Sequence, residues 1–67
     1  MTKNTKTSVL VALTRIQSEA QEFVKNAKIQ QTRCAPEQLD LWKESEKYWE
    51  QEYNDFQNAY NDVLNNH

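Results

Sequence analysis

The sequence predicts an all-α fold, an antiparallel two-helix hairpin with a coiled-coil-like interface. Three features of the 67-residue chain support this prediction. The chain has no glycine and is rich in Glu, Gln, Lys, Leu and Ala, which favour helix. Apolar residues recur in steps of three and four on both sides of the midpoint. The only proline, Pro36, separates the two apolar patterns and marks the connection between two helices.

The first helix is expected over about residues 8–30, with Thr7 or Ser8 as its N-cap. An apolar stripe runs along it in steps of 4, 3, 4, 3 and 4, which is the spacing of a coiled-coil seam. The residues of this stripe, expected in the hairpin core, are Val9, Leu13, Ile16, Ala20, Phe23 and Ala27. Polar residues fill most of the remaining positions, so the other faces of this helix are expected to be solvated.

The second helix is expected over about residues 36–64, after a turn at about residues 31–35. Pro36 fits a first helical turn, because a proline lacks the N–H that would have no partner there. The two acidic residues that follow it place negative charge at the positive end of the helix dipole. The second apolar stripe consists of Leu39, Trp42, Trp49, Tyr53, Phe56, Tyr60 and Val63, and Glu46 interrupts it once.

A hairpin that reverses between Cys34 and Ala35 places residues opposite each other when their numbers sum to about 69. The two tryptophans then face two alanines of the first stripe, and a large side chain opposite a small one fills the space between the helices. One expected pair departs from this pattern, because Phe23 faces Glu46.

Length and composition limit the function classes. With 67 residues the chain forms one domain. A domain of this size has marginal stability unless a disulfide, a bound metal or a partner chain adds to it. Its single cysteine excludes an internal disulfide and fits a reducing compartment, which indicates the cytoplasm. No other histidine or cysteine stands near His67 at ligand spacing, so no metal or other cofactor is expected. A partner chain is the remaining source of added stability.

Charge and hydropathy exclude further classes. Residues 1–34 carry +4 and residues 35–67 carry −6, so the two halves should attract each other in the fold. No basic stripe is large enough to indicate nucleic-acid binding. The apolar run at residues 9–13 is far shorter than the roughly 18 residues that span a membrane. The chain has no Ser-His-Asp or Cys-His arrangement and no glycine loop, so an enzyme is not expected.

The aromatic residues give the clearest functional signal, because six of the seven lie between positions 42 and 60. One facing helix with alanines in its seam cannot cover large rings on both flanks. Trp and Tyr are enriched among interface anchors, and exposed apolar patches mark partner sites. We therefore expect a protein-binding face. Its candidate residues are Leu10, Val24, Leu41, Trp42, Tyr48 and Trp49.

The stretch CAPEQLDLWKESEKYWE, residues 34–50, resembles the start of the second helix in the small type III secretion needle co-chaperones of the YscE, PscE and EscE kind. The resemblance is carried by Pro36, Glu37, Gln38, Leu39, Trp42, Glu44, Ser45, Lys47 and Glu50. It implies a cytoplasmic, virulence-associated co-chaperone that is not an enzyme. Such a protein binds a TPR-like chaperone and helps that partner to hold a needle subunit as a soluble monomer.

Two other functions stay open at this point. Two hairpins could bury the same apolar strips against each other as a self-associating adaptor, and a co-chaperone can also self-associate when its partner is absent. The acidic second half fits, less well, an inhibitor that mimics nucleic acid, although aromatic residues and lysines interrupt its acidic residues.

Overall fold

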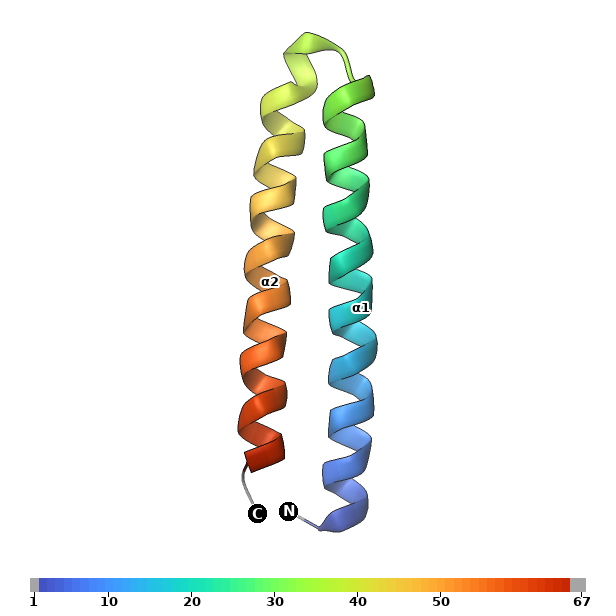
Figure 1. Ribbon diagram of the computed structural model, residues 1–67, viewed down its shortest axis with the longest axis vertical. Coiled ribbons are helices and arrows are strands. Elements are labelled where there is room, and N and C mark those ends of the chain that lie inside the picture. Colours follow the sequence, from blue (N-terminus) through green and yellow to red (C-terminus); the bar gives the residue numbers. More distant parts are fainter. Residues whose placement is uncertain (1, 66–67) are drawn as a thin grey trace.

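The computed structural model describes residues 2–65, which form two long antiparallel helices joined by a short connection (Figure 1). Helix α1 comprises Lys3–Arg33, the 3-10 helix η1 comprises Pro36–Gln38, and helix α2 comprises Leu39–Asn65. No strand occurs among the described residues. The all-α helical hairpin predicted from the sequence is therefore confirmed. Its Cα atoms extend over 51 × 14 × 10 Å.

Helix α1 begins at Lys3, several residues before Thr7 and Ser8. The N-cap expected at one of these two residues is therefore wrong. The N-cap is Thr2, whose Oγ1 accepts a hydrogen bond from the Thr5 N–H at 3.2 Å. Thr7 lies inside the helix, where its hydroxyl donates to the Lys3 carbonyl at 3.0 Å. No proline or glycine stands between the two candidate caps, so nothing stops the helix from extending back to the earlier threonine.

The connection between the helices is shorter than the expected turn at residues 31–35. Helix α1 continues to Arg33, and only Cys34 and Ala35 are extended, with φ/ψ of −77/164° and −64/149°. Ala35 is extended because the following Pro36 disfavours the α region for the residue before it. The chain enters η1 at this proline and continues directly into α2, so the second helical segment begins where the sequence places it.

The open end of the hairpin lies opposite the connection, where the start of α1 and the end of α2 lie side by side (Figure 1). A polar contact ties the two helices at this end, because Lys6 Nζ donates to the Leu64 carbonyl at 3.0 Å. A cation near the last carbonyls of a helix is favourable, since these groups lack intrahelical partners and carry the negative end of the dipole. Helix α2 ends at Asn65, one residue beyond the expected bound, and His67 lies outside the described residues.

The core of the hairpin is thin. Among the described residues only Ala20 and Ala27 are buried, with 1% and 0% of their surface exposed. Seven other residues expected in the core are half-buried, namely Val9, Leu13, Leu39, Tyr53, Phe56, Tyr60 and Val63. Ile16 and Phe23 are 39% and 47% exposed, so their expected burial is wrong. In a pair of helices, a side chain is fully covered only on the line between the two axes, and these two lie beside that line.

The helices pack in a register about three residues away from the expected one. Phe23 does not face Glu46 but stacks on Trp49, with 4.5 Å between ring centroids. Glu46 instead accepts a hydrogen bond from the side-chain amide of Gln31 at 2.7 Å. The shift arises because the reversal of the chain includes η1 as well as Cys34 and Ala35. The midpoint of the reversal therefore lies later in the sequence than the expected point between Cys34 and Ala35.

Candidate protein-interaction surface

The hairpin has two long sides, and helical geometry assigns the residues of α1 to them. At 100° per residue, a step of three and a step of four from one position reach opposite edges of a helix face. Counted from the buried Ala20, Ile16 and Phe23 lie on one edge, and Gln17 and Val24 lie on the other. The contacts that these residues make with α2 show that the two sides differ in chemistry.

One side, called here the amide side, is closed by hydrogen bonds between the helices. Gln17 Nε2 donates to Gln57 Oε1 at 2.6 Å, and Gln31 Nε2 donates to Glu46 Oε1 at 2.7 Å. Both bonds are partly buried. A shallow hollow on this side is lined by Gln21, Val24, Glu50, Tyr53 and Asn54. Four polar side chains of this side are therefore already paired across the seam.

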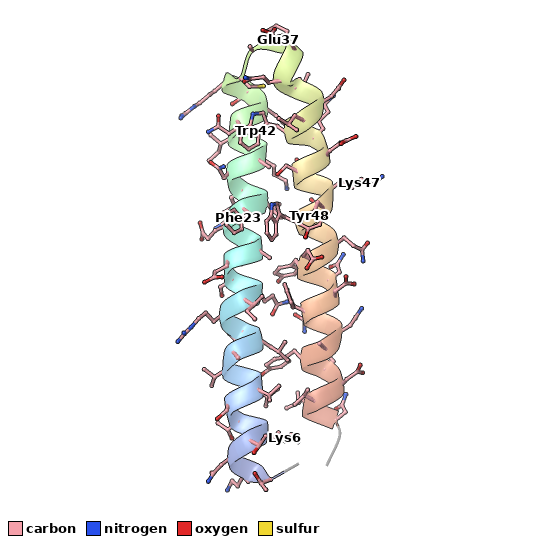
Figure 2. The ribbon with its side chains drawn as sticks, turned by 180° about the vertical axis from the view of Figure 1, so that it is seen from behind. Lys6, Phe23, Glu37, Trp42, Lys47 and Tyr48 are labelled. Atoms are coloured by element: carbon pink, nitrogen blue, oxygen red, sulfur yellow. The ribbon has the colours of Figure 1, made fainter. Side chains whose placement is uncertain are left out.

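The other side carries a cluster of three aromatic rings. Trp49 stacks on Phe23, with ring planes 22° apart, and the ring of Tyr48 meets the Trp49 ring edge-on at 5.0 Å and 82°. Both geometries are favoured for aromatic pairs. Phe23 on α1 and Tyr48 on α2 lie at the same level of the hairpin (Figure 2). Phe23 is nevertheless 47% exposed and Tyr48 57% exposed, so the cluster forms part of the surface.

Exposed aliphatic residues extend this cluster along both helices. Ile16 lies two turns from Phe23 on the same edge of α1 and is 39% exposed. Leu41 lies two turns from Tyr48 on the same edge of α2 and is 67% exposed. We call this surface the aromatic face; it consists of Ile16, Phe23, Leu41, Tyr48 and Trp49. Exposed apolar patches of this kind mark interaction sites in proteins.

The six candidate anchors from the sequence do not share one surface. Three of them belong to the aromatic face, namely Leu41, Tyr48 and Trp49. Val24 lies on the amide side, and Leu10 lies about four turns before it on the same edge of α1. Trp42 is half-buried and lies two turns from Trp49, nearer the connection (Figure 2). A partner on the aromatic face therefore contacts only part of the expected set.

Two residues of the aromatic face, Ile16 and Phe23, were not among the expected anchors. Their position relative to the small residues of α1 is the signal that identifies them. The seam follows the buried alanines, so large side chains three residues after or four residues before Ala20 fall on one edge. Val11 and Ile29 are also exposed but lie nine residues from Ala20, about two and a half turns, and so occupy the back of α1.

The charges of the two helices do not form ion pairs with each other. Within residues 2–65 the one ion pair joins Lys25 and Glu22, both exposed on α1, at 4.0 Å. The attraction expected between a basic first half and an acidic second half therefore produces no contact between charged side chains in this part of the chain. Two carboxylates of α2 accept hydrogen bonds from neutral amides instead, Glu46 from Gln31 and Asp55 from Gln51.

Other chemistry is sparse in the described part of the chain. Residues 2–65 hold no group of three or more His, Cys, Asp or Glu side chains placed to bind a metal ion. Cys34 is half-buried and ends α1, where its N–H donates to the Gln30 carbonyl at 2.7 Å. Neither α1 nor α2 has the length and apolar character to cross a membrane.

No protein-family model, curated protein or solved structure matches the chain. The resemblance to type III needle co-chaperones therefore rests on residues 34–50 alone. In the structure this stretch comprises the connection at Cys34 and Ala35, η1 and the first part of α2. It contains three residues of the aromatic face, namely Leu41, Tyr48 and Trp49.

Proposed function

We propose that the chain is a non-enzymatic binding module that docks on a helical-repeat protein. The observation that supports this proposal is the aromatic face, a row of apolar residues on one side of the hairpin, all of them exposed except the half-buried Trp49. Burying the exposed part of one such side chain contributes about 1 kcal/mol. A hairpin with two buried residues in its described part gains stability by mass action when a partner covers this face.

The more specific proposal follows from the resemblance of residues 34–50. The partner is a TPR-like chaperone in the cytoplasm, and the pair keeps a type III secretion needle subunit soluble and monomeric. Repeat proteins of this class stack helix pairs into a superhelix with an extended concave surface. A rod-shaped hairpin with one apolar side fits such a surface without any catalytic group.

Co-expression with the TPR-like chaperone and its needle subunit tests this function. We expect the tagged chain to recover both proteins. Tyr48→Ala should weaken recovery, because Tyr48 is 57% exposed on the aromatic face. Val11→Ala is the matched control, because Val11 is 56% exposed but lies on the back of α1. Equal recovery with both variants would show that the aromatic face is not the docking site.

The same experiment separates the co-chaperone from the self-associating adaptor. Recovery of the chain alone, as an oligomer, would contradict the co-chaperone function and favour the adaptor. Sedimentation of the purified chain then checks this outcome, because an adaptor of this type forms a tight homo-oligomer at sub-micromolar concentration.

A further inference from the structure

Two carboxylates border the aromatic face at one level of the hairpin. Glu19 is four residues before Phe23 on the same edge of α1, and Glu52 is four residues after Tyr48 on the same edge of α2. Phe23 stacks on Trp49, and the helices are antiparallel. One turn from this stack toward the open end therefore reaches Glu19 on α1 and Glu52 on α2.

Neither carboxylate has a cationic partner within residues 2–65, where the one ion pair joins Lys25 and Glu22. Arg15 stands one turn before Glu19 but does not pair with it. Asp55 and Asp62 extend the acidic border, because they lie two and four turns after Tyr48 on the same edge of α2. Asp55 accepts a hydrogen bond from Gln51 Nε2 at 3.0 Å, but none of these carboxylates forms an ion pair within residues 2–65. The apolar row is therefore flanked by negative charge that no cation of the described residues pairs with.

The lysines of α1 point elsewhere and do not neutralise this border. Lys3 and Lys28 lie on the edge of Val24, since they are 21 residues before it and four residues after it. Lys25 lies two heptads after Val11, on the back of α1. The hairpin thus presents its apolar residues together with acidic groups and one cation, Arg15, on one side, and these three lysines on the others.

The dimensions of the aromatic face fit a single helix. Ile16 lies seven residues from Phe23, and Leu41 lies eight residues from Trp49 in the opposite direction. At 1.5 Å per residue the row spans about 22 Å, which is about four helical turns. A third helix along this row would contact both α1 and α2, as in a three-helix bundle.

We infer that the aromatic face binds one amphipathic helix of about four turns, whose apolar stripe is bordered by Lys or Arg. The inference rests on the proposed function and names the chemistry of the partner's docking segment. The rings of Phe23 and Tyr48 pack under the apolar stripe, and Glu19 and Glu52 meet the cations at its border. A second copy is a poorer occupant, because two aromatic faces related by a two-fold axis would bring four carboxylates into one interface.

Two synthetic helical peptides test this inference. Both have about 18 residues and the same leucine stripe, but one has Lys at the border positions and the other has Glu. We expect the Lys-bordered peptide to bind at least about tenfold more tightly in about 50 mM salt, and this preference to shrink in about 500 mM salt. Backbone amide shifts should change around Phe23 and Tyr48, and not around Val11 and Ile29. Equal affinity of the two peptides would overturn the inference.

A matched pair of double variants separates the border from the net charge of the chain. Each double variant replaces one glutamate of α1 and one of α2 by glutamine. Glu19→Gln with Glu52→Gln should lower the affinity for the Lys-bordered peptide about tenfold. Glu22→Gln with Glu50→Gln removes the same charge, but Glu50 lines the hollow on the amide side, so less than about a twofold loss is expected. Equal losses would overturn the inference.

The two proposals fail in distinguishable ways. If the TPR-like chaperone binds, and Tyr48→Ala weakens its binding while the Glu19 and Glu52 double variant does not, the charged border is refuted and the proposed function stands. If sedimentation shows a tight dimer that the Lys-bordered peptide does not dissociate, the occupant of the face is a second copy. If both variants leave chaperone binding unchanged, the aromatic face is not the docking site and the inference about its occupant is wrong. If the chaperone does not bind the unmodified chain, the proposed function is wrong.

Discussion

Trp49→Ala is the substitution that tests most sharply what holds the hairpin together. The indole is half-buried between the helices, stacks on Phe23 at 4.5 Å and meets Tyr48 at 5.0 Å. Replacing a fully buried Trp by Ala destabilises by about 3–5 kcal/mol, and an aromatic pair contributes about 0.5–1.5 kcal/mol beyond its burial. For a half-buried Trp with two ring partners, we expect a loss of about 2–3 kcal/mol.

This loss is large for a chain whose core contributes no more than about 3–5 kcal/mol of stability. The midpoint of thermal unfolding, followed by far-ultraviolet circular dichroism, should fall by about 10–20 °C. Tyr48→Ala is the control, because it removes an exposed ring and leaves the stack of Phe23 on Trp49 in place, so about 1 kcal/mol is expected. A Trp49→Ala loss within about 0.5 kcal/mol of the Tyr48→Ala loss would refute the reasoning.

Three further substitutions probe local features of the fold. Pro36→Ala should lower the urea-unfolding free energy by about 0.5–1 kcal/mol, because it frees the unfolded chain and no longer disfavours helix through the connection; no change in the urea midpoint would contradict this. Gln31→Ala should destabilise the fold by about 1 kcal/mol, because its side-chain amide donates a hydrogen bond to Glu46 at 2.7 Å. A double-mutant cycle with Glu46→Ala should therefore show a coupling free energy between the two residues. Strictly additive losses would argue against that bond. Thr2→Ala should speed amide hydrogen exchange in the first turn of α1, whereas Thr7→Ala should not, because Thr2 is the N-cap.

The fold could be predicted because several sequence features agree. The two stripes of apolar residues, the absence of glycine and the position of Pro36 all indicate two helices with one reversal. The residue before the proline is extended for a local steric reason that holds in any fold. The start of α1 could not be fixed in this way, because several threonines near the N-terminus are all competent caps. The choice among them depends on how far the helix extends.

The surface was harder to predict, because it depends on the register and rotation of the helices. A stripe in steps of three and four includes both the seam and its edges, so Phe23 and Ala20 look equivalent in the pattern. Only the packing of α1 on α2 shows that the alanine is buried and the phenylalanine is 47% exposed. The same holds for Val24 and Tyr48, which the sequence placed on one partner surface and the structure places on opposite sides.

In the proposed complex the aromatic face contacts the partner protein, and the back of α1 does not. Site-specific photo-crosslinking in the complex with the TPR-like chaperone tests this claim most directly. A photoreactive phenylalanine analogue replaces either Phe23 or Ile29, which are both 47% exposed but lie on different sides of α1. We expect a crosslink to the chaperone from position 23 and none from position 29. Equal crosslinking from both positions, or crosslinking from position 29 alone, would contradict the claim.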